Sequence, residues 1–86
     1  MDIKVLGMGC PNCQRLERIV REVVAEMGVE ATFSKVTDMR KIMSYDIVGT
    51  PGLVINGQVV SSGRVPTRAE VTTWVANAAM AEEAKS

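Results

Sequence analysis

The chain has 86 residues, ten basic and ten acidic side chains, 47% hydrophobic residues and no histidine. A chain of this length forms one domain and buries roughly 60–65% of its unfolded surface without a structural metal or a disulfide lattice. Zero net charge gives no overall field to attract nucleic acid or an anionic membrane, so we expect neither partner. The lack of histidine excludes histidine acid–base catalysis and histidine metal ligands within this chain, which leaves Cys10 and Cys13 as the strongest candidates for chemistry.

The first half of the chain predicts four elements, namely a strand at 2–6, a helix at 12–27, a strand at 31–36 and a short helix at 38–45. Pro11 suits the first turn of the longer helix because its missing N–H removes no helical hydrogen bond. Gly28 suits the left-handed cap that follows its last turn. In the short helix we expect Met39, Ile42 and Met43 to face inward.

The second half predicts a β-hairpin followed by a third helix. Two β-rich runs, at 53–55 and 58–60, are joined by Asn56-Gly57, the dipeptide that best tolerates the positive φ angles of a two-residue turn. Residues 67–70 match a capping box, and the apolar stripe after it belongs to a helix packed on the sheet. Apolar side chains are missing after Ala81, so we expect residues 82–86 to fray from a domain that spans residues 1–81.

The predicted order is strand, helix, strand, helix, hairpin, helix. Strand-helix-strand units favour parallel pairing, whereas a hairpin is antiparallel. We therefore expect an α/β fold of order β-α-β-α-β-β-α, with a four-stranded mixed sheet covered by three helices. The cysteine loop then follows the carboxyl end of the first strand, where open α/β sheets place their functional sites.

The two cysteines stand at the start of the longer helix, with Cys10 immediately before it and Cys13 one turn inside. Helix N-terminal N–H groups stabilise an anion, which lowers the pKa of Cys10 from the free value of about 8.5. The prediction is that Cys10 attacks a substrate disulfide and that Cys13 resolves the mixed disulfide, leaving a Cys10–Cys13 bond for another reductant to open. Pro11 stiffens the loop, Gly9 leaves Cys10 sterically open, and Asn12 is a tuning position.

The start of the chain lacks the features of a secretory signal, and no apolar run approaches the roughly 20 residues of a membrane span. We therefore expect a cytoplasmic protein. In a reducing compartment, a close cysteine pair is more often redox-catalytic or metal-binding than structural.

Metal binding is the alternative function. Met8, Cys10 and Cys13 offer a thioether and two thiolates, soft ligands that suit Cu(I) or, with further donors, zinc. The run of residues 7–13 also resembles the Gly-Met-x-Cys-x-x-Cys loop of heavy-metal-associated domains, the small copper chaperones and pump modules. Taken alone, a methionine such as Met8 is more often a core residue than a ligand.

The second half of the chain separates these two functions. Gly49-Thr50-Pro51-Gly52, followed by a strand, Asn56-Gly57 and another strand, resembles the corresponding segment of the thioredoxin and glutaredoxin family. Copper chaperones instead end in strand-helix-strand. With the cysteine loop included, the likeness runs from Ile3 to Ala78, and it is greatest to the small thioredoxin-like proteins of bacteria and archaea sometimes called redox-active disulfide protein 2.

This resemblance implies a minimal thioredoxin-like fold and a thiol-disulfide oxidoreductase of the protein disulfide reductase type, active in electron transport. It implies a cis Thr50–Pro51 bond beside the cysteine loop, with the Thr50 backbone open to a substrate and Pro51 facing the thiols. The implied partners are a disulfide-containing protein substrate and a reductase as electron donor, without a cofactor. We expect a monomer.

The chain departs from typical thioredoxins at two positions. Gly9 stands where they carry tryptophan, and the preceding strand offers Lys4 but no obvious acid to assist proton transfer. Tyr45 could lie near the loop, although a half-buried core position is the more common environment for such a tyrosine. Arg15, Arg64 and Arg68 could edge the site, although a solvated surface charge is the more common environment for each.

Overall fold

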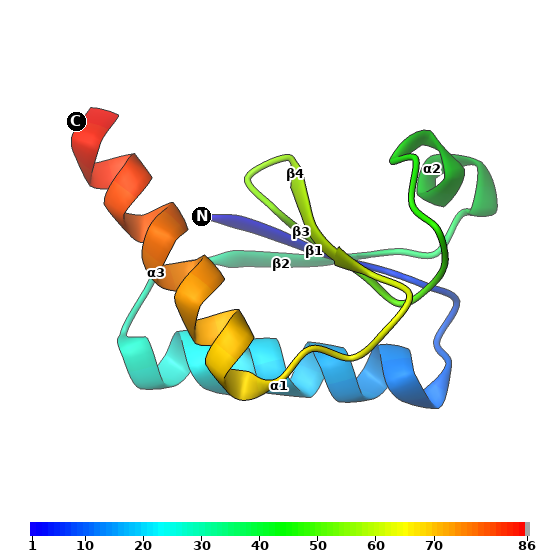
Figure 1. Ribbon diagram of the computed structural model, residues 1–86, viewed down its shortest axis with the longest axis horizontal. Coiled ribbons are helices and arrows are strands. Elements are labelled where there is room, and N and C mark those ends of the chain that lie inside the picture. The colour runs from blue at the N-terminus through cyan, green and yellow to red at the C-terminus, as the bar shows by residue number, and fades with distance from the viewer. Residues whose placement is uncertain (86) are drawn as a thin grey trace.

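The fold is described by a computed structural model that covers residues 1–85. The elements are β1 (Asp2–Leu6), α1 (Pro11–Met27), β2 (Thr32–Val36), α2 (Met39–Ser44), β3 (Gly52–Ile55), β4 (Gln58–Ser62) and α3 (Arg68–Lys85). The strands form one sheet in the order β2-β1-β3-β4, in which β1 runs parallel to β2 and antiparallel to β3. Helices α1 and α3 cover one face and α2 covers part of the other (Figure 1). The predicted α/β fold, mixed sheet and three covering helices are confirmed.

The two faces of the sheet carry separate apolar clusters because side chains alternate along β1. Ile3 and Val5 point to α1 and α3 and belong to the larger cluster. Leu6 points the other way and packs with Ile42 of α2 and with Val54 of β3. A slip of one residue in the strand pairing would move each set to the wrong face, so burial on both sides specifies the register.

Helix α1 begins one residue before the predicted start and ends at Met27, as the sequence predicts. Cys10 is its N-cap, Pro11 is its first residue, and Gly28 caps it in the left-handed region with φ +66°. Val24 is 5% exposed and packs in the larger apolar cluster, whereas Met27, the last residue of the helix, is 36% exposed.

Helix α2 buries less than predicted. Ile42 is 3% exposed, but Met39 and Met43 are 51% and 70% exposed, so the prediction that all three face inward is wrong. A helix of six residues makes fewer than two turns and presents little of its circumference to the sheet. The N-cap is Asp38, whose Oδ1 accepts a hydrogen bond from Arg40 N at 2.9 Å.

The predicted hairpin joins β3 to β4. Asn56 and Gly57 have φ angles of +50° and +81°, as a two-residue turn of this type requires. The register between β3 and β4 shifts at a bulge between Leu53 and Val54. Strand β4 continues to Ser62, two residues beyond the predicted run of 58–60.

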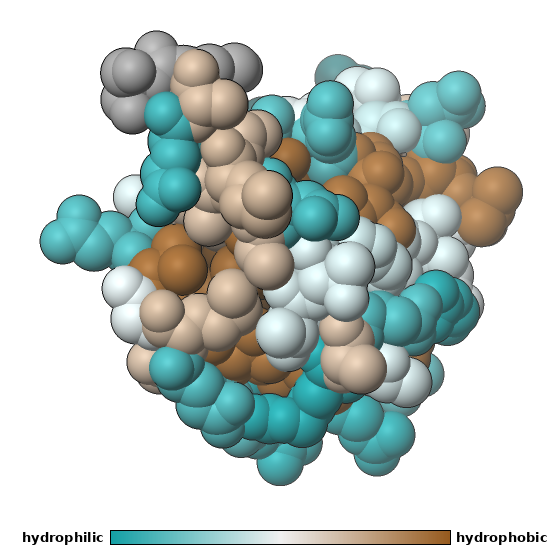
Figure 2. Space-filling model, turned by 60° about the vertical axis from the view of Figure 1, so that its left-hand side comes forward, coloured by the Kyte–Doolittle hydropathy of each residue, from teal (hydrophilic) through white to brown (hydrophobic). Residues whose placement is uncertain are grey.

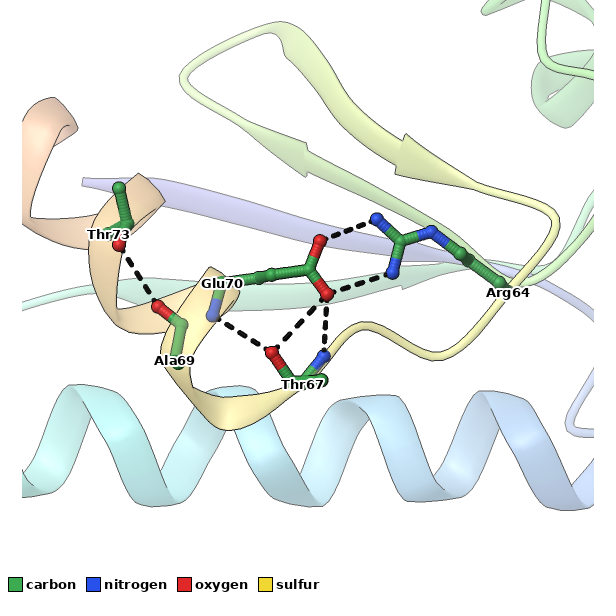
Figure 3. Close-up of polar contacts among 5 residues, drawn as sticks. All are labelled: Arg64, Thr67, Ala69, Glu70 and Thr73. Atoms are coloured by element: carbon green, nitrogen blue, oxygen red, sulfur yellow. Dashed lines mark hydrogen bonds and ion pairs between the residues drawn. The ribbon is translucent and has the colours of Figure 1, made fainter.

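The capping box of α3 is also present (Figure 3). Thr67 N donates to Glu70 Oε1, and Glu70 N donates to Thr67 Oγ1, each at 3.1 Å. Arg64 adds two hydrogen bonds to the Glu70 carboxylate, at 2.9 and 2.6 Å. The helix continues to Lys85, beyond the boundary expected at Ala81. The fraying of residues 82–86 stays a prediction, and Ser86 lies outside the described residues.

Glu70 makes the stability of the fold depend on pH. Its hydrogen bonds from Arg64 and from the Thr67 N–H lower its pKa from 4.5 to about 2. A carboxyl group whose pKa is lower in the folded state stabilises the fold above its unfolded pKa, and this stabilisation is lost as the pH falls from 4.5 to about 2. We expect Glu70→Gln to reduce the fall in melting temperature across this pH range. Glu30→Gln is the control, because Glu30 is an exposed acid on a loop, and equal pH profiles for the two variants would contradict the assignment.

Within residues 1–85, no helix combines the length and the apolar character needed to cross a membrane.

Candidate active site

Cys10 and Cys13 lie at the carboxyl end of β1, where the chain turns into α1 (Figure 1). They form a disulfide, with their Cα atoms 5.0 Å apart. Cys10 is partly exposed, whereas Cys13 is buried, with 5% of its surface exposed. The two sulfur atoms therefore occupy different environments, and only Cys10 is open to a large partner.

The start of α1 directs a backbone donor at Cys10. Cys13 N donates a hydrogen bond to Cys10 Sγ at 3.1 Å. In the oxidised protein this sulfur belongs to the disulfide, and it marks the position of the thiolate in the reduced protein. Unpaired N–H groups and the partial positive charge of a helix N-terminus favour an anion at this position. The expected helix-start geometry of the cysteine pair is confirmed.

The residues around Cys10 keep it accessible. Pro11 and Asn12, which form the first turn with Cys13, are exposed. Gly9 has a φ of +84°, and a Cβ atom there would meet nothing within 4 Å, so backbone conformation and not crowding requires glycine. Gln14 Nε2 donates to Gly9 O at 3.2 Å and ties the loop to the helix.

Gly7 is required for steric reasons and not for the backbone flexibility that glycine gives a loop. A Cβ atom at this position would overlap Cys13 Sγ and would lie 3.3 Å from Cys13 Cβ. The same atom would be 3.9 Å from Thr50 Cβ. Gly7 is therefore the place where the backbone passes against the buried sulfur, and its close approach needs a residue without a side chain.

The Thr50–Pro51 peptide bond is cis, as the family resemblance implies. Pro51 is buried and Thr50 is exposed. Gly63 N donates to Gly49 O at 3.1 Å and to Pro51 O at 3.0 Å, which ties this segment to the end of β4. Because Thr50 approaches Gly7, the segment lies beside the cysteine loop as expected.

The other residues named from the sequence lie in several environments, and Met8 belongs to the cysteine loop itself. Met8 is 65% exposed and is not a core residue. Tyr45 packs against the smaller apolar cluster and is a core side chain. Arg64 is held by Glu70, and Arg68 by Glu22 and Glu26, so both arginines belong to surface ion pairs.

The structure contains a pocket beside Cys13 that the sequence did not predict. It lies between the cysteine loop, α1 and β2, and its lining includes Cys13, Met8, Glu17 and Lys35. The Glu17 carboxylate binds Lys35 Nζ at 3.0 Å. The spacing of Cys13 and Glu17, four residues apart on one helix, indicates a shared face. No sequence signal places Lys35 there, because that requires the pairing of β1 with β2.

A second hollow lies at the opposite end of the sheet, between the hairpin and α3, and is lined by Ile55, Val60 and Trp74. Figure 2 looks at the side that carries α3, where hydrophobic residues reach the surface among hydrophilic ones. The residues lining this hollow include no titratable group, so it adds nothing to the chemistry of the cysteines.

The order of the elements bears on the metal-binding alternative. The chain ends in a hairpin and a helix, β3-β4-α3, and not in the strand-helix-strand of heavy-metal-associated domains. The likeness to those domains is therefore confined to the loop of residues 7–13. Among residues 1–85, no group of three or more histidine, cysteine, aspartate or glutamate side chains is arranged to hold a metal ion.

Comparisons with known proteins agree with this geometry. A family model described as a thioredoxin domain matches residues 1–76. A protein named thioredoxin from Methanothermobacter thermautotrophicus is 39% identical over 71 residues, which cover 83% of this chain and 92% of the relative. Two proteins named thioredoxin from Methanocaldococcus jannaschii are also similar. One is 35% identical over 69 residues, which cover 80% of this chain and 79% of the relative. The other is 40% identical over 62 residues, which cover 69% of this chain and 72% of the relative.

Proposed function

The chain belongs to the thioredoxin family and is a thiol-disulfide oxidoreductase, and within this activity we propose that Cys10 is the attacking sulfur and Cys13 the resolving one. The observation that carries the proposal is the difference in exposure between the two sulfurs. Cys10 is reachable and accepts a backbone hydrogen bond, whereas Cys13 is 5% exposed. A buried thiol is suited to react with a sulfur already held next to it.

The reaction begins with the reduced protein. The Cys10 thiolate attacks one sulfur of a substrate disulfide, a Cys10–substrate bond forms, and the other substrate sulfur leaves as a thiolate that takes up a proton. Cys13 then loses its proton and attacks Cys10 Sγ, which releases the second substrate thiol. Two electrons have passed to the substrate, and the protein is left with the Cys10–Cys13 disulfide. A reductase returns two electrons to open it.

The substrate surface consists of the residues that surround the accessible sulfur. We assign it to Gly9, Pro11, Asn12 and Thr50, with Pro51 as the buried support beneath Thr50. The exposure of Thr50 and its approach to Gly7 support this assignment. An extended substrate segment could then pair with the Thr50 backbone while its own sulfur meets Cys10.

Thioredoxins act on disulfide substrates and are returned to the dithiol by a reductase, so these two classes of partner follow from the family. The further proposals are that residues 1–81 form the functional domain, that the protein acts as a monomer in the cytoplasm, and that it binds neither nucleic acid nor membranes. A reducing compartment suits a protein that must return to its dithiol after each turnover.

The assignment of the two sulfurs predicts their order of alkylation. With less than one equivalent of iodoacetamide at neutral pH, the reduced protein should be modified at Cys10 at least about tenfold faster than at Cys13, because exposure and thiolate character both control reactivity. Peptide mapping by mass spectrometry measures the ratio. Denatured protein is the control, in which the two cysteines should react at similar rates. Equal labelling of the folded protein, or preference for Cys13, would refute the assignment.

A further inference from the structure

We propose that Asn56 is a site of spontaneous deamidation, and that this modification opens a latch that joins the N-terminus, the β3–β4 turn and α3. The latch consists of Met1, Asp2, Asn56 and Glu82. It lies at the end of the sheet opposite the cysteine loop, where the N-terminus and the β3–β4 turn lie near the C-terminal half of α3 (Figure 1). The inference concerns a modification of this chain and not its disulfide chemistry.

The side-chain amide of Asn56 is held at both of its polar atoms. Asp2 N donates a hydrogen bond to Asn56 Oδ1 at 2.8 Å, and Asn56 Nδ2 donates to Glu82 Oε1 at 3.1 Å. An N–H donor needs the amide oxygen and a carboxylate needs the NH2 group, so these two contacts fix the orientation of the amide. The same Glu82 oxygen pairs with the Met1 ammonium at 3.3 Å. Asn56 therefore connects β1, the turn and α3.

The dipeptide Asn56-Gly57 also has the sequence and the surroundings in which an asparagine deamidates. The Gly57 nitrogen loses its proton to solvent base and attacks Asn56 Cγ, ammonia leaves, and a succinimide forms, which water opens to aspartate or isoaspartate. Glycine favours the attack because it has no side chain to shield its nitrogen. Asn56 is exposed, and a Cβ atom at Gly57 would meet nothing within 4 Å, so no other part of residues 1–85 covers the turn on that side.

The latch slows this reaction in the intact fold. Asn56 Nδ2 is the leaving group, and it must gain a proton to depart as ammonia, whereas in the fold it donates a hydrogen bond to the Glu82 carboxylate. Closing the succinimide ring therefore requires this hydrogen bond to break first, which adds to the barrier. The rate of deamidation then reports how often Glu82 releases the amide.

Deamidation turns the contact with Glu82 from attractive to repulsive. The Nδ2 donor is replaced by a carboxylate oxygen, which places a negative charge beside Glu82 Oε1. The Met1 ammonium, which already pairs with Glu82, offsets part of this repulsion, so we expect a loosened latch and not an unfolded protein. Isoaspartate also lengthens the backbone of a two-residue turn whose geometry fixes the register of its strands.

Peptide mapping by mass spectrometry, during incubation of the full-length protein in mildly alkaline buffer, measures the reaction. Asn56 should convert to the acid, whereas Asn12 and Asn77, neither of which precedes a glycine, should remain amides. Glu82→Ala should convert about three- to tenfold faster than the parent, because a hydrogen bond to a charged group is lost. Glu30→Ala, which removes an exposed acid from the same end of the sheet, is the control and should convert at the parent rate.

Two results of this incubation would overturn the proposal. One is an equal rate of conversion in the parent and in Glu82→Ala. The other is an Asn56 amide that persists in Glu82→Ala over the time in which the urea-denatured parent is converted.

The effect of the modification on the latch is measured with Asn56→Asp, which has the charge of the product. Its melting temperature should be lower than that of the parent by about 2–8 °C. The same change in a Glu82→Gln background should cost less, because no second charge is then present to repel the new carboxylate. Asn77→Asp makes the same chemical change at an exposed position of α3 and should melt with the parent. An Asn56→Asp protein that melts with the parent, or equal losses in both backgrounds, would contradict the latch.

Discussion

Replacing Cys10 by serine is expected to lower the rate of insulin disulfide reduction, with dithiothreitol as electron source, by at least about 100-fold after the uncatalysed rate is subtracted. A serine hydroxyl is not ionised at neutral pH and does not attack disulfides, so the first bond cannot form. The partly exposed position of Cys10 at the helix start leaves no other sulfur able to replace it, because Cys13 is 5% exposed.

The matched control is Ala25→Ser, which adds a serine to an exposed position near the other end of α1. It should retain the activity of the parent protein. The two variants should have the same far-ultraviolet circular dichroism, which shows that loss of turnover is not loss of fold. If the Cys10→Ser protein reduced insulin as fast as the parent, the attacking role of Cys10 would be excluded.

The substitution Gly7→Ala is expected to lower the stability of the folded protein by a large amount. The added methyl group would overlap Cys13 Sγ and crowd Cys13 Cβ at 3.3 Å, so either the loop or the sulfur must move. Overpacking of this kind destabilises a folded protein by about 1–3 kcal/mol, which is roughly 4–8 °C in melting temperature per kcal/mol for a domain of this size. The loss should be larger in the oxidised protein, since the reduced sulfur is not bonded to Cys10 and can rotate away.

Melting curves of the oxidised and reduced proteins measure this difference. Gly49→Ala is the control, because a Cβ atom there would meet nothing closer than Gly63 Cα at 3.6 Å. It lies in the segment before Pro51, at the same end of the sheet. A Gly7→Ala protein that melts with the parent in both redox states would show that the close approach to Cys13 is not a constraint.

The elements that could be predicted from the sequence are those with local signals. Pro11 and Gly28 mark the ends of α1, Asn56-Gly57 marks the hairpin, and residues 67–70 form the capping box that was expected. Each signal depends on the conformation of a few adjacent residues. The different environments of Cys10 and Cys13 could be predicted in the same way, because both residues stand at the start of a helix.

The features that were missed depend on three-dimensional packing that local sequence patterns do not specify. Lys35 reaches the pocket beside Cys13 only because β2 pairs in parallel with β1 in one register, which helical or strand periodicity does not specify. Gly7 is constrained by a sulfur six residues later in the chain. Met39 and Met43 have the spacing of a buried face, but α2 is too short for that face to cover the sheet.

The central claim is that the two sulfurs perform successive steps. The most direct test is to mix reduced Cys13→Ser protein with a disulfide substrate and to measure the intact mass of the products. Without the resolving thiol, a mixed disulfide should accumulate to near one equivalent, and peptide mapping should place it at Cys10. Under the same conditions Cys10→Ser should form little adduct. A Cys13→Ser protein that forms no adduct, or a Cys10→Ser protein that forms as much adduct through Cys13, would contradict the assignment.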